Sequence, residues 1–96
     1  MTDLLTSVSR SELQEKDYGD GLGVLLTAAQ KLAQVDWEVA SISNADGHTC
    51  ACYVTALSRW VILETLDSAD LALAMFYVTF QDARGKVTTV IVEAAV

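Results

Sequence analysis

The chain has 96 residues, no proline, two cysteines and a formal net charge of −7, and 52% of its residues are hydrophobic. This length predicts one domain over residues 1–96, large enough to bury a core. Thirteen Asp and Glu residues against six Lys and Arg residues argue against direct binding to nucleic acid or to an anionic membrane, because both attract cations.

Two helices are predicted at the N-terminal end. The sequence SRSE fits a capping box, in which Ser9 accepts a hydrogen bond from the helix start and Glu12 reaches back, and it predicts a short helix over residues 10–17. The glycines of DYGDGLG then interrupt it, and Asp20 is a good N-cap. A second helix is predicted over residues 22–34. Its apolar stripe consists of Leu22, Leu25, Ala29 and Leu32, widened by Val24 and Ala28.

After the second helix the hydrophobic pattern takes a period of two, which is typical of strands. DWEVASIS and HTCACYVTAL flank the turn sequence NADG, and AMFYVTFQ and KVTTVIVEAAV flank DARG. A short glycine-containing turn between two such runs predicts a hairpin. We therefore expect two antiparallel hairpins, at residues 37–55 and 73–95.

Residues 57–70 fit either a strand or a helix. LSRWVILETL alternates as a strand over 59–66, which favours a five-stranded meander with one main helix across a face. A helix beginning near Ser58 would instead give a four-stranded sheet in the order α, β, β, α, β, β, and Ser68 could cap a further turn. Both alternatives are α+β: an antiparallel four- or five-stranded sheet of two hairpins, with an N-terminal helical layer on one face.

The one histidine and both cysteines lie within NADGHTCACYV. A two- or four-residue loop would place His48, Cys50 and Cys52 on one face of the hairpin, and a three-residue loop would reverse this assignment of faces. The apolar side chains on that face would be Trp37, Val39 and Val54. Same-face neighbours stand about 6.5–7 Å apart, so three in a row converge on one zinc ion only with a bulge. Apolar surroundings keep a thiol protonated. We expect structural cysteines, with no metal site, no cofactor and no catalytic residue.

Seven of the thirteen acidic residues lie within residues 12–20 and 64–70. Acidic patches of this kind steer a protein onto a basic partner surface. The sequence therefore predicts a small acidic non-enzymatic protein-binding protein, an inhibitor or adaptor. One example would be a protein encoded by a mobile element and acting against a nucleic-acid-binding defence complex of the host. The expected partner-binding residues are Asp17, Asp20, Glu64, Asp67 and Asp70.

The last two predicted strands carry large apolar groups on both faces, and a single helix covers only one face of a sheet. The final strand ends VIVEAAV without a proline or a lysine, which leaves an unguarded edge. Both features predict a homodimer paired through the sheet. The expected interface residues are Met75, Tyr77, Val90 and Val92.

The second helix, VDWEVASIS and NADGHTCA together resemble the roadblock or longin type of small dimerising scaffold over about 60 residues. The shared feature is a helix followed by a hairpin with an Asp-Gly turn, although that family's C-terminal helix is not expected here. The resemblance implies a dimerising scaffold or chaperone subunit as the alternative function. A small enzyme with an unrecognised site is the third.

The location of the protein is expected by elimination to be the cytoplasm, without membrane association. The first residues form no signal peptide, and the longest apolar run, LALAMFYV, is too short to span a bilayer. Two cysteines separated by one residue form no disulfide framework, which fits a reducing compartment.

Overall fold

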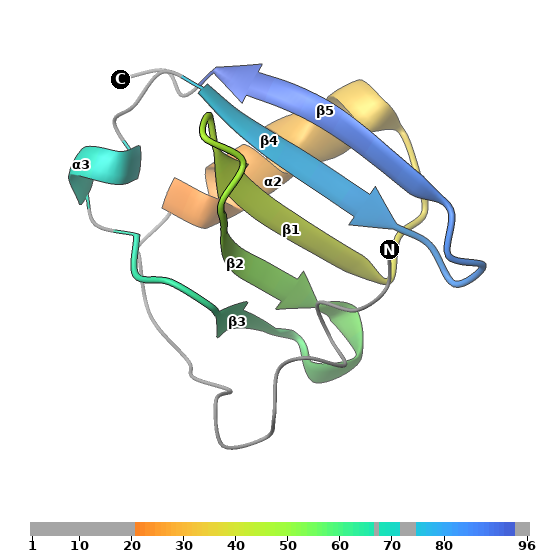
Figure 1. The fold of residues 1–96 in the computed structure, drawn as a ribbon. Coiled ribbons are helices and arrows are strands. Elements are labelled where there is room, and N and C mark those ends of the chain that lie inside the picture. The colour runs from red at the N-terminus through yellow and green to blue at the C-terminus, as the bar shows by residue number, and fades with distance from the viewer. Residues whose placement is uncertain (1–20, 67, 72–74, 94–96) are drawn as a thin grey trace.

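The computed structural model describes residues 21–66, 68–71 and 75–93, with α2 (Gly21–Ala33) first in chain order (Figure 1). The elements after α2 are β1 (Val39–Asn44), β2 (Thr49–Val54), the 3₁₀ turn η2 (Thr55–Leu57), β3 (Arg59–Ile62), α3 (Ser68–Leu71), β4 (Met75–Gln81) and β5 (Val87–Glu93). The helix predicted over residues 10–17 lies outside the described residues, with its capping box of Ser9 and Glu12 and with Asp20.

The five strands form one sheet in the order β3-β2-β1-β4-β5, and every neighbouring pair is antiparallel. This confirms the α+β class, the two hairpins and the N-terminal helix on one face. The predicted meander is wrong, because β4 pairs with β1 and not with β3. The chain leaves β3 at one edge of the sheet and returns through α3 to the other side of β1 (Figure 1).

The third strand ends at Ile62, whereas the sequence predicted a strand over 59–66. The carbonyl of Cys50 accepts hydrogen bonds from the backbone N–H groups of Leu63, at 3.2 Å, and Glu64, at 3.0 Å. Because one carbonyl takes two successive donors, the chain turns away from the direction of the strand there. Leu66 is then buried in the core and fixes the new path.

The main core lies between α2 and the face of the sheet that α2 covers (Figure 1). From the helix it takes Leu22, Leu25 and Ala29, as predicted. Leu32 and Val24 were predicted on the same stripe but are 67% and 62% exposed. At 3.6 residues per turn Val24 lies roughly 130° from the centre of the buried stripe, which accounts for its exposure, whereas Leu32 lies only roughly 50° from that centre, next to Leu25. The strand residues of this core are Ala40, Ile42, Cys50, Ala51, Ile62, Phe76, Val78, Phe80 and Val92.

Aromatic rings extend this core across the sheet from β3 to β4. The ring centroids of Trp60 and Tyr53 are 5.3 Å apart, those of Tyr53 and Trp37 5.4 Å, and those of Trp37 and Phe80 6.1 Å. Trp37 therefore lies on the helix side, and its prediction on the opposite face with Val39 is wrong. A bend at Glu38 separates Trp37 from β1, so the alternation of strand faces does not extend to it.

The face opposite α2, here called the open face, has two different halves. Over β1, β2 and β3 it carries a second buried cluster of Val39, Cys52, Val54 and Val61, with Leu63 partly buried against it. Over β4 and β5 it carries the exposed side chains of Met75, Val87 and Ile91. The second half is the apolar surface that the described strands present.

Candidate functional site

The tip of the first hairpin is a three-residue loop, not the predicted two- or four-residue loop. The N–H of Gly47 donates to the carbonyl of Asn44 at 3.0 Å, and the N–H of Asn44 donates to the carbonyl of His48 at 3.3 Å. Gly47 has a φ of +83°, the left-handed conformation that such loops require at their last position and that glycine adopts without strain.

A β-bulge on β2 lies directly after this loop. Ile42 pairs with Ala51, but its neighbour Ser43 pairs with Thr49, so Cys50 is an extra residue between the two pairs. The bulge turns Cys50 into the helix-side core, whereas Cys52 belongs to the buried cluster of the open face. The prediction that His48, Cys50 and Cys52 share one face is therefore wrong.

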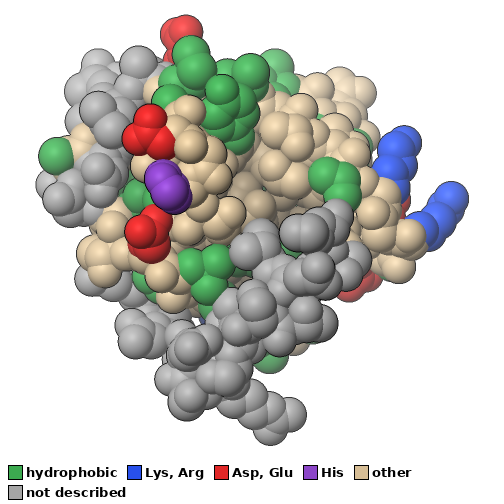
Figure 2. All heavy atoms as spheres, in the orientation of Figure 1, with side chains coloured by type: hydrophobic (Ala, Val, Ile, Leu, Met, Phe, Trp, Pro, Cys, Tyr) green, Lys and Arg blue, Asp and Glu red, His purple; other side chains and the backbone are tan. Residues whose placement is uncertain are grey.

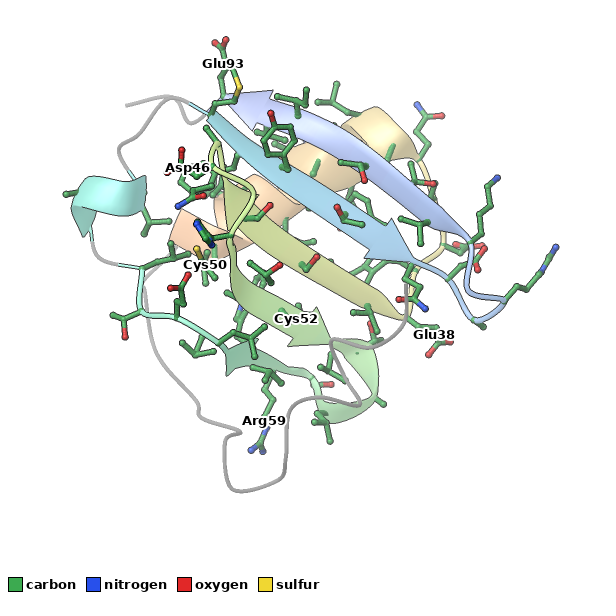
Figure 3. The ribbon with its side chains drawn as sticks, in the orientation of Figure 1. Glu38, Asp46, Cys50, Cys52, Arg59 and Glu93 are labelled. Atoms are coloured by element: carbon green, nitrogen blue, oxygen red, sulfur yellow. The ribbon has the colours of Figure 1, made fainter. Side chains whose placement is uncertain are left out.

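Both cysteines are free thiols in buried positions. The Cys50 sulfur lies 3.4 Å from the carbonyl oxygen of His48 and 3.9 Å from Oε2 of Glu64. Its single S–H can donate to either oxygen (Figure 3). A carboxylate at this distance repels a thiolate and so opposes nucleophilic chemistry. Burial raises the pKa of the Cys52 thiol from 9.0 to about 11, which keeps it protonated near neutral pH.

The hairpin tip has an acidic rim. Asp46 and His48 are exposed on the loop, and Glu64 is exposed beside Cys50. Acidic side chains flank the histidine on the surface in Figure 2. Sequence reasoning named Glu64 but not its position beside the hairpin tip, because that position depends on the bulge. Within the described ranges, no three His, Cys, Asp or Glu side chains are placed to hold a metal ion.

The acidic residues predicted to bind a partner are only partly described. Glu64 lies at the hairpin tip, and Asp70 belongs to α3 at the same end of the sheet (Figure 1). Asp17, Asp20 and Asp67 lie outside the described residues. Of the two predicted patches, the structure therefore describes the side chain of Glu64, and it places Asp70 only as a position in α3.

The predicted set of interface residues is divided between the two faces. Tyr77 pairs with Ile91 and Met75 pairs with Glu93, and all four side chains belong to the open face. Val92 is 6% exposed in the helix-side core, and Val90 packs against that core. The expectation of one exposed face with Val90 and Val92 beside Met75 and Tyr77 is therefore wrong. Ile91 (55% exposed) and Val87 (44%) take their places, because residues alternate between the faces of a strand.

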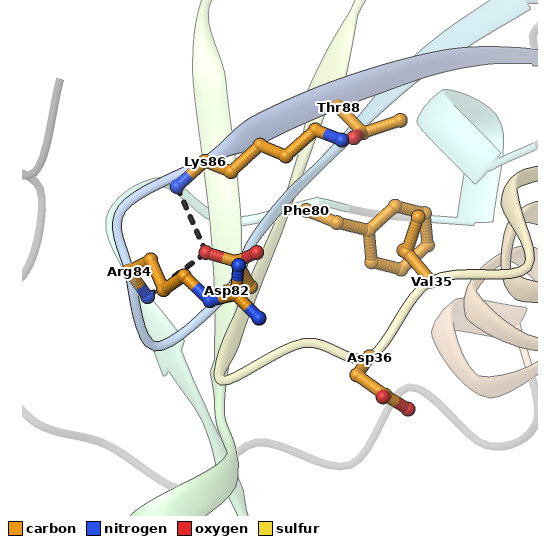
Figure 4. Close-up of a pocket in the computed structure, with 7 residues that line it drawn as sticks. All are labelled: Val35, Asp36, Phe80, Asp82, Arg84, Lys86 and Thr88. Carbon is orange, nitrogen blue, oxygen red and sulfur yellow. Dashed lines mark hydrogen bonds between the residues drawn. The ribbon is translucent and has the colours of Figure 1, made fainter.

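A pocket of about 220 Å³ lies beside the turn of the second hairpin (Figure 4). The Asp82 carboxylate accepts hydrogen bonds from the backbone N–H groups of Arg84 and Lys86, both at 2.9 Å, so the turn already uses it. The lining balances two carboxylates against two cations and favours no ligand charge. The lining residues are Val35, Asp36, Phe80, Asp82, Arg84, Lys86 and Thr88.

Helix α2 borders a wider hollow of about 550 Å³ lined by Gly23, Val24, Thr27, Ala28 and Lys31.

In the parts of the chain that the structure describes, no helix is long and apolar enough to cross a membrane. Comparison of the chain with protein-family models, with curated proteins and with solved structures finds no match.

Proposed function

We propose that the protein is a small acidic, non-enzymatic protein-binding protein, an inhibitor or adaptor that docks onto a basic surface of another protein. One observation carries the proposal: acidic and apolar side chains meet at one end of the sheet. Asp46 and Glu64 lie at the tip of the first hairpin. Asn44 pairs with Phe76, so this tip lies at the same end of the sheet as Met75.

Glu93 adds a third carboxylate at this end, since it pairs directly with Met75 (Figure 3). An apolar centre with a charged rim is the usual anatomy of a protein-binding surface. In such a surface the buried apolar contact supplies affinity, while the rim charges raise the association rate and select partners of opposite charge. The net charge of −7 extends the attraction for a basic partner beyond the contact itself.

The proposal is tested by capture from the native host on immobilised protein, with the double variant Asp46→Lys and Glu64→Lys. The matched control is Asp36→Lys with Glu38→Lys, which makes the same change of charge at two other exposed positions. We expect the wild type and the control to retain one basic protein that elutes as salt rises, and the hairpin-tip variant to lose it. Equal retention by both variants, or equal loss, contradicts docking at this end.

The alternative function is a dimerising scaffold or chaperone subunit. It is favoured by a different observation, the position of β5 at the edge of the sheet. The two functions use largely different parts of the molecule, since the first depends mainly on the tip of β1 and β2 and the second on β5, and they share Glu93.

A further inference from the structure

The two edges of the sheet differ in how they are protected. Edge strand β3 has four residues, begins with the exposed charge of Arg59 and ends where the chain turns away at Leu63. Edge strand β5 has seven residues, VTTVIVE, with no proline, no bulge and no charge before its last position. Short, charged and bent edges resist pairing with other strands, whereas long and regular edges favour it.

The turn of the second hairpin shows which backbone groups of β5 point away from β4, its one neighbouring strand in the described parts of the chain. The N–H of Asp82 donates to the carbonyl of Lys86, so these two residues form a hydrogen-bonded pair. Such pairs alternate along an antiparallel ladder. Thr88, Val90 and Val92 therefore direct their backbone groups at β4. The residues that direct theirs outward are Val87, Thr89, Ile91 and Glu93.

We infer that β5 pairs with β5 of a second copy of this chain, antiparallel, about a two-fold axis at Val90. The outward residues must bond to outward residues, which allows only registers that match odd numbers with odd numbers. Of these, the register centred on Val90 places Val87 opposite Glu93 of the second copy and Thr89 opposite Ile91, and so pairs the whole strand. The five-stranded sheets of the two copies then become one continuous sheet.

The charges at the two ends of β5 favour the antiparallel direction. Arg84 and Lys86 lie in and after the turn that begins the strand, and Glu93 ends it. Antiparallel pairing places Lys86 of each copy at the same end of the joined strands as Glu93 of the other, although the two side chains belong to different faces, whereas parallel pairing would bring like charges together at both ends. Opposite charges across neighbouring strands stabilise the pair, and like charges destabilise it.

The side chains of β5 also suit a second copy of the same strand. Val87 and Ile91 are exposed on the open face, and in this register each Ile91 lies diagonal to Ile91 and to Val87 of the other copy. Apolar side chains that are half exposed in one copy thus acquire apolar neighbours. Such pairing of identical surfaces is the usual form of a two-fold dimer interface.

This inference rests on the scaffold alternative and shares only Glu93 with the proposed docking surface, so the variants at Thr89 and Ile91 test it separately. It is tested by sedimentation of the full chain over a concentration series. We expect reversible dimers, and a dissociation constant raised on the order of tenfold or more by Thr89→Pro, which removes an outward N–H and leaves the backbone bonds to β4 in place. Thr89→Val is the matched control, because it removes only the hydroxyl that lies 3.0 Å from that of Thr79. A wild type that stays monomeric at high micromolar concentration overturns the inference, and so does an unchanged constant in a folded proline variant.

Ile91→Lys and Met75→Lys form a matched pair in case the proline disturbs the fold. Both place a lysine on the open face, but only Ile91 belongs to the edge strand. We expect Ile91→Lys to abolish the dimer and Met75→Lys to keep it. Equal loss in both variants would place the interface on the open face and overturn the edge pairing.

Charge exchange tests the direction of pairing. Lys86→Glu and Glu93→Lys should each weaken the dimer, and the double variant should restore it, because opposite charges then lie at each end of the joined strands again. In parallel strands like charges meet at each end before and after every exchange, so single variants that leave the dissociation constant unchanged overturn the proposed direction.

The register is tested by mixing Thr89→Cys protein with Ile91→Cys protein under mild oxidation. Directly opposite strand residues are close enough for a disulfide. The proposed register predicts a mixed cross-link that neither variant forms alone in comparable yield. Equal cross-linking within either single variant would contradict the axis at Val90.

Discussion

The two hairpins have the same kind of turn but differ in how their strands pair. In each, a three-residue loop ends in a glycine with positive φ, +83° at Gly47 and +84° at Gly85. In each, the side-chain oxygen of the residue before the loop accepts a hydrogen bond from the backbone N–H two positions later. Asn44 accepts from Asp46, and Asp82 accepts from Arg84. The strands then diverge: β4 and β5 pair without interruption, whereas β2 bulges at Cys50.

This difference separates local from tertiary causes. The turn depends on a few neighbouring residues, so two short sequences of similar chemistry give the same loop. The bulge depends on a distant segment, because the Cys50 carbonyl bonds to Leu63 and Glu64 and the Cys50 thiol approaches the Glu64 carboxylate. The first hairpin is therefore shaped by the chain that passes it, and the second by its own sequence.

Phe76→Ala in the second hairpin has the largest expected effect on stability. Phe76 is fully buried between α2 and the sheet. Its truncation should lower the free energy of unfolding by about 3–5 kcal/mol, measured by urea denaturation. Phe76→Leu, which keeps most of the volume, should cost clearly less. Similar losses for both variants would mean that this core does not depend on the aromatic ring.

The Cys52 thiol should make stability fall at alkaline pH. Its pKa is about 11 in the folded chain and 9.0 as a free thiol, so between these values the unfolded state has lost a proton that the folded state keeps. Stability is therefore full below pH 9 and decreases towards pH 11, by on the order of 2 kcal/mol. Comparison of Cys52→Ala with the wild type at pH 7, 9 and 10.5 should show this slope removed. An unchanged slope would assign the alkaline loss to other groups.

Cys50→Ala and Cys52→Ala should both cost stability and leave partner capture intact, because both thiols are buried. In the native protein, thiol reagents near neutral pH should react slowly, at the rate of opening of the structure. Rapid labelling of either cysteine before unfolding would contradict a structural role for it.

Gly47→Ala and Gly85→Ala compare the two turns directly. A Cβ at either position meets no heavy atom within 4 Å, so the cost is conformational alone. Each change should lower the free energy of unfolding by about 1–2 kcal/mol, measured by thermal or chemical denaturation. The two losses should be nearly equal. A much larger loss at Gly47 would show that the bulged hairpin tolerates less change in its loop.

The smallest expected effect is the difference between Asn44→Ala and Asp82→Ala in the free energy of unfolding. The Asp82 carboxylate accepts two backbone N–H groups, and the Asn44 side chain accepts one. With each bond contributing ~0.5–1.5 kcal/mol, Asp82→Ala should cost more by about one such bond. The reverse order would indicate that Asn44 supports the bulge beyond its own turn.

Local sequence signals predicted most of the fold. The helix expected over 22–34 is α2 at Gly21–Ala33, and the two glycine turns place both hairpins. Strand order was not predictable from the same signals, because pairing of β4 with β1 depends on how the chain leaves β3. That path depends on hydrogen bonds from Leu63 and Glu64 to Cys50, which no periodicity encodes.

The candidate site was less predictable than the fold. The extra residue at Cys50 offsets the three-residue loop, so the residues beyond the bulge keep their expected faces. Cys50 itself turns into the helix-side core, so the expected grouping of His48 with both cysteines failed. In the second hairpin, Tyr77 pairs with Ile91, so Val90 and Val92 lie on the other face of the sheet from both. The alternation of faces along β5 already separates Val90 and Val92 from Ile91. The acidic character of the surface, by contrast, is a direct result of composition.

The strand order also has a consequence for synthesis of the chain on the ribosome. β1 is the central strand, and its partner on one side, β4, is more than thirty residues further along the sequence. Strands β1 to β3 can pair as they emerge, but one side of β1 stays open until residues 75–81 emerge. Such distant pairing slows folding relative to local contacts. The nascent chain therefore presents an incomplete sheet, with one side of its central strand unpaired, until the residues that close it have emerged.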